Sequence, residues 1–355
     1  MKTNRRKFIA VSAISALAGM TRLKSFQDKQ DAMFIEDRNI RGYHNSDLII
    51  PDTLKSGDKV AITAPSSPTN LTESRYGARF MKEMGCQVVY GDTVKEQRNQ
   101  YRYLSAPDEL RAEEFMAFIR DPEVKAIFCA RGGYGSIRIL ELLDYDEIRR
   151  NPKIIIGFSD ITSLLIAINN RSSIVTYHGP VASMQLNAYT RENLQKTLFS
   201  DVPELLINDT GFKTITEGSA RGRLVGGNLS VLVTTLGTPY EIDTKGAVLF
   251  IEDVSEDAYK IDRMLHHLKL AGKFDDVNGI MFGQFKNLHS RRPFYPNRGY
   301  NIFELFDQVI KPLKIPAIYN MPFGHVSSQI TLPLGTTAEF DTKSNNFKIL
   351  INSIS

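Results

Sequence analysis

The segment "KIIIGFSDITSLLIAI", residues 153–168, sets a run of isoleucines directly before Gly-Phe-Ser-Asp and a second apolar run. The first run is short and β-branched, which is typical of a buried strand, and the second has the length of a helix. A buried strand followed at once by a helix indicates a parallel α/β sheet. Ser159 and Asp160 at the break are either N-caps of the helix or the site of an exposed, reactive hydroxyl.

The same alternation of strand and helix continues on both sides of this segment. Apolar strand-like runs occur in "KVAITAPSSP", "CQVVYGD", "VKAIFCARGGYGS" and "IVTYHGP", with helical patterns between them. Strands that are apolar throughout predict a parallel, Rossmann-like sheet covered on both faces, and we place this α/β domain at residues 56–190. Ligands bind at the carboxyl ends of such strands, where "ARGGYG" and "GFSD" fall.

A second, β-rich α/β domain is expected at residues 219–355, after a linker at 191–218 that contains one helix. "GAVLFIEDVSED" predicts an apolar strand that ends in acids, and "YKIDRMLHHLKLAG" predicts an amphipathic helix. "VNGIMFGQF" is a further strand-like run, and the alternating pattern of "QITLPLGTTAEFDTKSNNFKILIN" predicts more strands.

The N-terminus, "MKTNRRKFIAVSAISALAGM", indicates export. A basic segment precedes an apolar run of about 13 residues and a small-x-small cleavage site, as in secretory signals. The Arg5-Arg6 pair resembles a twin-arginine signal. We therefore expect a signal peptide at 1–18, a polar arm at 19–55, a periplasmic mature protein and no stable membrane insertion after cleavage.

Composition argues against a nucleic-acid partner. The 355 residues are 42% hydrophobic and 24% charged, and the formal net charge is +4. Removal of four N-terminal basic residues, Lys2, Arg5, Arg6 and Lys7, balances bases and acids, so the mature chain lacks a basic surplus. The two cysteines, Cys86 and Cys129, lie in or beside apolar runs and are interpreted as buried hydrophobic residues.

A nucleophilic Ser159 would need a base and a carboxylate to orient that base. Of the six histidines, His178 in "TYHGP" and His325 in "NMPFGHVSS" follow strand-like or turn segments, and spacing does not choose between them. Glu252 ends the apolar strand "AVLFIE" and is the candidate carboxylate. Its alternative role, shared with Asp253, is a solvated strand end or a cap.

Other chemistries lack their motifs. "ARGGYGS" has neither the G-x-x-x-x-G-K-[ST] nor the G-x-G-x-x-G spacing of nucleotide loops, although its glycines could bring backbone N–H groups close to a ligand. No H-E-x-x-H or C-x-x-C occurs. We expect no metal and no cofactor.

Between residues 58 and 340 the sequence resembles the L,D-carboxypeptidases related to muramoyl-tetrapeptide carboxypeptidase. The resemblance rests on seven segments in order: "APSSP", "ARGGYGS", "IIGFSDIT", "YHGP", "GGNLSVL", "LFIEDVSEDAYKIDRML" and "FGHVSSQITLPLG". It implies a catalytic triad of Ser159, Glu252 and His325, in a cleft between the two domains.

The resemblance also implies release of the terminal D-alanine from peptidoglycan tetrapeptides, through an acyl-enzyme. The N–H of Asp160 and one from Gly132, Gly133 or Gly135 would form the oxyanion hole, with Gly133 taken as the partner. Asp160 would also cap the helix. Arg131 and Asn228 are candidates for binding substrate carboxylates, with structural turn roles as their alternative. Two-domain relatives suggest a homodimer.

Two other functions remain open. Some relatives of the same fold cleave peptidyl or aminoacyl nucleotide antibiotics and confer immunity, an activity that would favour a cytoplasmic enzyme. A periplasmic peptide-binding module without turnover would keep the cleft and need no triad.

Overall fold

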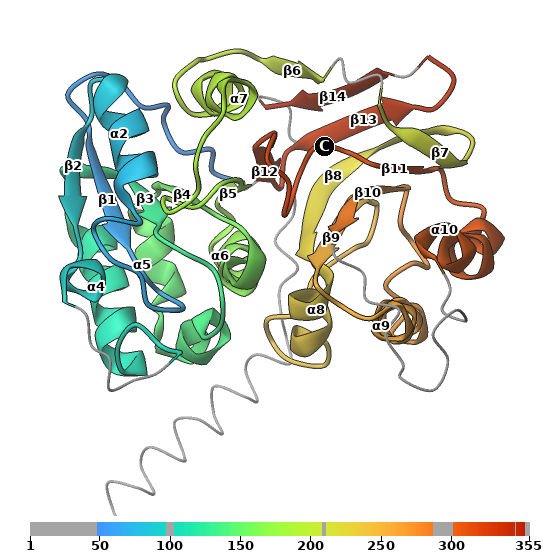
Figure 1. Ribbon diagram of the computed structural model, residues 1–355, viewed down its shortest axis with the longest axis horizontal. Coiled ribbons are helices and arrows are strands. Elements are labelled where there is room, and N and C mark those ends of the chain that lie inside the picture. The colour runs from blue at the N-terminus through green and yellow to red at the C-terminus, as the bar shows by residue number, and fades with distance from the viewer. Residues whose placement is uncertain (1–47, 97–102, 208–210, 287–300, 345, 352–355) are drawn as a thin grey trace, which may run out of the picture. The chain divides into compact units, whose positions relative to one another are not determined.

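The computed structural model describes residues 48–96, 103–207, 211–286, 301–344 and 346–351 (Figure 1). The expected signal peptide, the arm as far as residue 47, and two of the six histidines, His44 and His289, lie outside the described residues. Residues His44–Ser355 form one compact unit. No helix within the described ranges is long and apolar enough to span a membrane.

The first sheet has six strands among the described residues, in the order β12-β5-β4-β3-β1-β2. Its members are β1 (Lys59–Thr63), β2 (Gln87–Tyr90), β3 (Val124–Cys129), β4 (Ile154–Gly157), β5 (Thr176–His178) and β12 (Leu332–Leu334). Strands β1 to β5 run parallel to one another, as the sequence predicted. Strand order therefore reverses between β1 and β3, the position at which open α/β sheets bind ligands.

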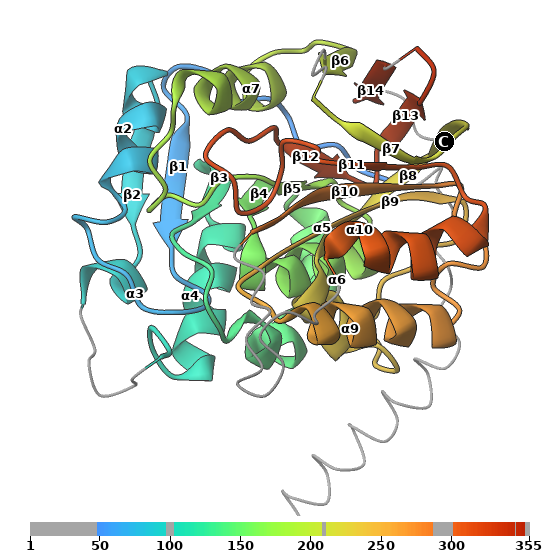
Figure 2. The ribbon, with the colours of Figure 1, turned by 45° about the vertical axis from the view of Figure 1, so that its right-hand side comes forward.

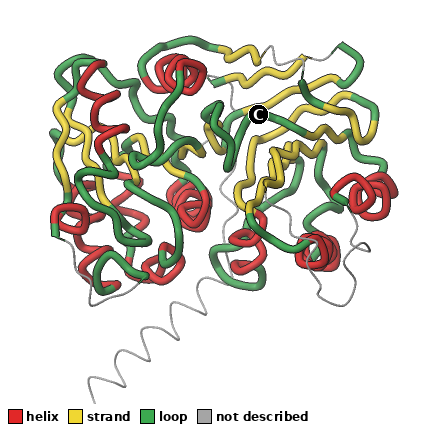
Figure 3. Tube along the Cα trace, viewed as in Figure 1, coloured by secondary structure: helices red, strands yellow, loops and turns green. Residues whose placement is uncertain are grey.

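Helices supplied by the same stretch of chain accompany this sheet (Figures 1 and 3). They are α2 (Arg75–Glu83), α3 (Asp92–Lys95), α4 (Asp108–Arg120), α5 (Tyr145–Arg150), α6 (Thr162–Ser172) and α7 (Ala188–Leu198), with short 3-10 helices at Ser136–Leu142 and Ser159–Ile161.

The central strands of the first sheet are largely buried on both faces, which explains their nearly continuous apolar runs, whereas the edge strand β2 is partly exposed. In β4, Ile154 and Ile156 belong to one hydrophobic cluster, whereas Ile155 belongs to another. Phe128 and Ile127 of β3 divide in the same way. Successive side chains of a strand point to opposite faces, so a sheet covered twice requires apolar residues at every position.

The second sheet has eight strands among the described residues, in the order β6-β14-β13-β8-β9-β10-β11-β7. They are β6 (Glu204–Ile207), β7 (Lys213–Thr216), β8 (Ser219–Asn228), β9 (Ala247–Val254), β10 (Gly279–Lys286), β11 (Ala317–Tyr319), β13 (Thr337–Asp341) and β14 (Asn346–Leu350). The central strands β8 to β11 are parallel, and the outer pairs are antiparallel.

Helical segments of the second half accompany this sheet, with α9 and α10 seen side by side in Figure 2. The segments are α8 (Leu229–Leu232), α9 (Ala258–Leu270) and α10 (Ile302–Leu305), a π-helical turn at Phe306–Ile310, and 3-10 turns at Val233–Thr235 and Lys311–Leu313. The predicted class, a parallel-sheet α/β part followed by a β-rich α/β part, is confirmed.

Two features of the connectivity differ from the sequence prediction. The 191–218 segment contains strands β6 and β7 of the second sheet in addition to a helix. Strand β12 joins the first sheet, antiparallel to β5, although it lies in the C-terminal part of the chain. A strand of three residues has too short a pattern to identify its distant partner.

Candidate functional site

Ser159 lies on a strained turn between β4 and α6. Phe158 is extended, and Ser159 then takes φ 63°, a left-handed conformation that a residue with a side chain rarely adopts. Such a conformation costs about 1–3 kcal/mol and is concentrated at functional sites. Neither Ser159 nor Asp160 caps a helix through its side chain. The turn therefore has the geometry of a nucleophile elbow, although only the first of the two usual flanking glycines, Gly157, is present and Ile161 stands at the second position.

A glycine of the loop after β3 lies directly against this turn. A Cβ atom on Gly132 would come within 2.8 Å of Ser159 Cβ and 3.1 Å of Ser159 Oγ, so only glycine fits there. Gly133 instead faces Ser67, since a Cβ on it would come within 2.2 Å of Ser67 Oγ. Within the described residues, the N–H groups of Gly132 and Gly133 donate to no acceptor.

Asp160 fastens the turn to two other loops and does not cap the helix, contrary to the sequence prediction. Its buried carboxylate accepts hydrogen bonds from Ser66 Oγ at 2.5 Å and from the N–H of Ser136 at 2.8 Å. Ser136 Oγ in turn donates to the Asp160 carbonyl at 2.5 Å. Because these residues follow β1, β3 and β4, one carboxylate ties three strand ends together.

Glu252 and His325 form a buried acid–base pair. Glu252, at the end of β9, is 0% exposed, and its Oε2 lies 2.7 Å from His325 Nδ1. The same oxygen accepts the backbone N–H of His325 at 3.2 Å. Gly324, the residue before His325, has φ 85°, and a Cβ on it would come within 2.4 Å of Glu252 Oε2. Only glycine therefore allows the chain to approach the carboxylate this closely.

The surroundings of Glu252 favour its ionised form. Burial raises the pKa of the carboxyl, yet the hydrogen bond and charge of His325, with help from His178 and Asn228, hold the pKa below its ordinary value. Asn228 Nδ2 donates to Glu252 Oε1 at 3.2 Å. An ionised acceptor on Nδ1 fixes the histidine tautomer and leaves Nε2 free to accept a proton.

Phe158 connects the serine turn with the histidine. Its ring centroid lies 4.8 Å from that of His325, and Ser159 is the next residue along the chain. The first turn of α6 also meets the end of β8, because Thr162 Oγ1 accepts the N–H of Asn228 at 3.1 Å. No hydrogen bond joins Ser159 to His325 among the residues described here, and such contacts are often long in the absence of substrate.

The two predicted substrate contacts differ in accessibility. Arg131, beside Gly132, is exposed, and its guanidinium lies 3.6 Å from Glu73. Asn228 is buried, and its amide binds protein groups on both sides: it donates to Glu252 and Asp253 and accepts from Ser230 Oγ and the N–H of Val231. Asn228 thus orients Glu252, whereas Arg131 can meet a ligand.

His178, the other candidate base, lies close by without joining the pair. It is 1% exposed, packs against Phe158 and Phe250, and neither ring nitrogen has a hydrogen-bond partner. Burial lowers its pKa to about 4. A neutral, inaccessible imidazole without an orienting acceptor is poorly suited to take a proton from Ser159.

The burial of two charged residues near the site, Asp253 and Arg111, was not predicted from the sequence. Asp253, next to Glu252, accepts the N–H groups of Ser230 and Val254, and burial raises its pKa to about 6. Arg111 is a fully buried cation of α4. The only sequence signal for these residues was a charged residue at an apolar helix position or strand end.

The cysteines are buried, as predicted, and both are free. Burial raises the pKa of Cys86 to about 11 and that of Cys129 to about 12. Within the described part of the chain, no three His, Cys, Asp or Glu side chains gather in a way that could hold a metal ion.

Comparison with known proteins places these features in a family. The family models described as LD-carboxypeptidase N-terminal domain and C-terminal domain match residues 60–179 and 221–340. The chain is 38% identical over 301 residues to "Probable murein peptide carboxypeptidase" of Bacillus subtilis, covering 82% of this chain and 91% of that protein. It is 28% identical over 295 residues to the murein tetrapeptide carboxypeptidase of Pseudomonas aeruginosa, covering 79% and 92%.

A solved structure gives a second comparison. The microcin C7 self-immunity protein MccF of Escherichia coli, in complex with aspartyl sulfamoyl adenosine, aligns with a TM-score of 0.76 at 26% identity. The alignment covers 86% of this chain and 100% of that one.

Proposed function

Because the chain belongs to the LD-carboxypeptidase family, we propose that it is a serine carboxypeptidase that removes the terminal D-alanine of peptidoglycan tetrapeptides. The observation that carries the proposal is the Glu252–His325 hydrogen bond beside the strained turn of Ser159. The names of two relatives, a murein peptide and a murein tetrapeptide carboxypeptidase, support the substrate class.

In the proposed reaction Ser159 Oγ attacks the carbonyl carbon of the bond between the L-centre and D-alanine. His325 Nε2 accepts the hydroxyl proton and then gives it to the departing amine, while Glu252 stabilises the imidazolium. The peptide is left as an ester on Ser159, and water activated by His325 hydrolyses that ester.

The negative charge of the tetrahedral intermediate would be stabilised by backbone N–H groups. Asp160 is the second residue of the short helix Ser159–Ile161, and Gly132 is the loop glycine that lies against the serine side chain. We therefore propose Asp160 and the Gly132–Gly133 segment as the oxyanion hole. Arg131, an exposed cation beside this loop, is proposed to meet a substrate carboxylate.

The place of action is proposed from the N-terminus. A twin-arginine-like signal would deliver the folded enzyme to the periplasm, where it would trim wall peptides in place. Replacement of Arg5 and Arg6 by lysine should then leave the protein in the cytoplasmic fraction. An interdomain position of the site and a homodimer belong to the same proposal.

The direct test is the release of free D-alanine from L-Ala-D-Glu-diamino acid-D-Ala, with Ser159→Ala in parallel. Release by the wild type alone supports both the reaction and the nucleophile. Release by both proteins would eliminate Ser159 as the nucleophile.

The similarity to MccF supports a second candidate, cleavage of an aminoacyl nucleotide analogue, since that protein was solved with aspartyl sulfamoyl adenosine. Turnover of this compound, without D-alanine release, would favour the second candidate. A folded protein that turns over neither compound and binds the tetrapeptide would be a binding module.

A further inference from the structure

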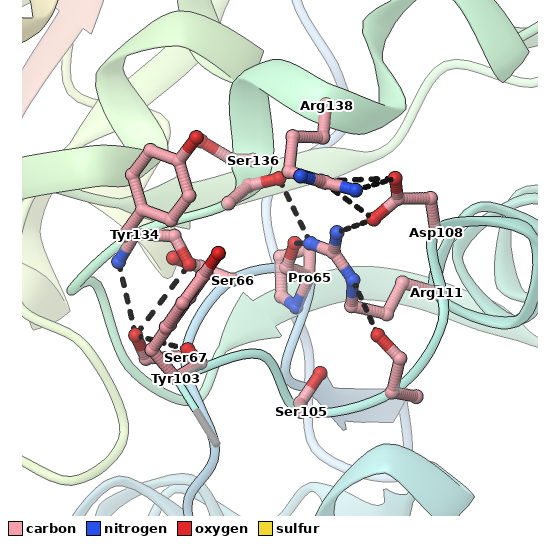
Figure 4. A network of polar contacts seen from close by, with 12 residues as sticks. Pro65, Ser66, Ser67, Tyr103, Ser105, Asp108, Arg111, Tyr134, Ser136 and Arg138 are labelled. Atoms are coloured by element: carbon pink, nitrogen blue, oxygen red, sulfur yellow. Dashed lines mark hydrogen bonds and ion pairs between the residues drawn. The ribbon is translucent and has the colours of Figure 1, made fainter. Parts of the chain in front are cut away.

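Arg111 is a fully buried cation, and each of its three guanidinium nitrogens donates to a group of the protein. Its side chain, on α4, is 0% exposed. Nη1 donates to the carbonyls of Gly135, at 2.9 Å, and Pro65, and Nε donates to the carbonyl of Ala106 at 3.1 Å. Nη2 binds the carboxylate of Asp108 (Figure 4). Burying a charge is costly unless it is paired and hydrogen-bonded. We therefore ask which function the buried Arg111 guanidinium serves.

Two of those carbonyls belong to the loops that meet at the serine turn. Pro65 lies in the loop after β1, and Gly135 lies in the glycine loop after β3. The peptide that offers the Gly135 carbonyl to Arg111 offers its N–H, that of Ser136, to the carboxylate of Asp160. The next residue after Pro65, Ser66, donates its hydroxyl to the same carboxylate.

A continuous polar chain thus runs from Arg111, through one peptide group, to Asp160. Each hydrogen bond in such a chain polarises and strengthens the next. Arg111 is also attracted to the charge of Asp160. Gly132, which touches Ser159, lies three residues before Gly135 in the same loop, so the position of this loop relative to Ser159 depends on how Gly135 is held.

We propose that Arg111 is a positioning residue of the oxyanion hole: it holds the glycine loop so that its free N–H groups face the oxygen of the tetrahedral intermediate. This inference rests on the proposed function. Arg111 does not touch the substrate; it acts through the peptide of Gly135 and through Asp160. Asp108, which also binds Arg138 with Nε–Oδ2 at 2.9 Å, orients the guanidinium from the opposite side.

The test compares Arg111→Lys and Arg111→Met with a matched control on the same helix. Arg120→Met removes an arginine that is 45% exposed and that pairs, among the residues described here, with Glu113 and Glu147. For each protein, kcat and KM of D-alanine release, Tm, and the rate at which a fluorophosphonate labels Ser159 are measured. In this reaction Ser159 Oγ displaces fluoride through a five-coordinate phosphorus, and the phosphoryl oxygen uses the same oxyanion hole without any peptide substrate.

The lysine variant keeps the charge and loses the planar fork that bridges the two carbonyls. We expect its kcat and its labelling rate to fall by about 10²–10³-fold, as when one oxyanion donor is lost, with KM changed less than about threefold. The Arg120→Met control should retain the wild-type values. A folded lysine variant with kcat and labelling within threefold of wild type would overturn the proposal, as would a change confined to KM.

Two further comparisons separate a failure to fold, or a wrong substrate, from a failure of the proposal. If both Arg111 variants fail to fold, Asp108→Asn leaves the guanidinium in place but removes its orienting charge. It should lower the labelling rate at least tenfold, and an unchanged rate would overturn the proposal. If the wild type releases no D-alanine but its Ser159 labels in an Arg111-dependent way, the substrate assignment has failed and the positioning role stands.

Discussion

Replacement of Glu252 by glutamine should almost abolish catalysis without unfolding the protein. Oε2 of Glu252 accepts two donors of His325, Nδ1 and the backbone N–H, and Oε1 accepts Nδ2 of Asn228. All three partners donate, and glutamine has only one acceptor oxygen. Whichever way its amide is turned, an NH₂ group faces a donor.

The two orientations damage catalysis in different ways. With NH₂ toward His325, Nδ1 must become an acceptor, the proton moves to Nε2, and Nε2 can no longer take the proton of Ser159. In serine proteases a change of this kind costs about 10⁴ in kcat. With the oxygen toward His325 the tautomer survives, but the charge that stabilises the imidazolium is lost. We expect kcat to fall about 10³–10⁴-fold, or about 4–5.5 kcal/mol in the barrier.

The assay is D-alanine release at saturating tetrapeptide, with Tm measured on the same preparation. A second substitution tests the donor argument: Asn228→Asp, added to Glu252→Gln, supplies an acceptor for the new NH₂ group and turns the glutamine oxygen toward His325. The kcat of the double variant should be at least about tenfold higher than that of Glu252→Gln alone. A folded single variant within tenfold of wild type would refute the role of Glu252. A double variant no faster than the single one would refute the donor argument.

Three further outcomes follow from burial and close contact. Gly132→Ala should lower kcat by about 10²-fold with little change in Tm. The new Cβ would lie only 2.8 Å from Ser159 Cβ and would push Ser159 out of position; an unchanged kcat would mean that Ser159 is placed differently. His178→Leu should keep D-alanine release and lessen the acid sensitivity of folding. The folded pKa of His178, about 4, is below its ordinary 6.5, so wild type loses up to about 3 kcal/mol relative to the variant as pH falls from 6.5 to 4, measured by urea unfolding. A thiol reagent at pH 8 should leave Cys86 and Cys129 unmodified in native protein and modify both after unfolding; rapid native labelling would contradict their burial.

The regular part of the fold could be predicted because its signals are local. The apolar strands β1, β3 and β4 and the helices between them follow directly from hydrophobic runs and turn residues. Strand β12 could not be predicted as a member of the first sheet. This strand, Leu332–Leu334, pairs with β5 across more than 150 residues of sequence. Its three residues carry too little pattern to identify β5 as the partner.

The same distinction holds for the site. Ser159 and Glu252 each stand at the end of an apolar strand, and that position is visible in the sequence. The choice of His325 over His178 was not, because both follow plausible segments, and a hydrogen bond to Glu252 exists only after the chain has folded. The predicted helix cap of Asp160 is wrong, because its carboxylate binds groups that follow other strands and are distant in the sequence. Asn228 has the structural role that was its alternative, since its side chain caps α8 and also reaches Glu252 of β9.

The polar groups of the site therefore divide into two assemblies. Asp160 and Arg111 join the loops after β1, β3 and β4, all within the first sheet. Glu252 holds His325 by both its ring and its backbone, and Asn228 supports it from β8. Changes in the first assembly should act on Ser159 and its oxyanion hole, and thus on fluorophosphonate labelling even where the peptide is a poor substrate. Changes in the second should act on proton transfer, and thus on the pH dependence of kcat. A variant of Arg111 that altered the pH dependence and left labelling intact would show that the two assemblies are not separate.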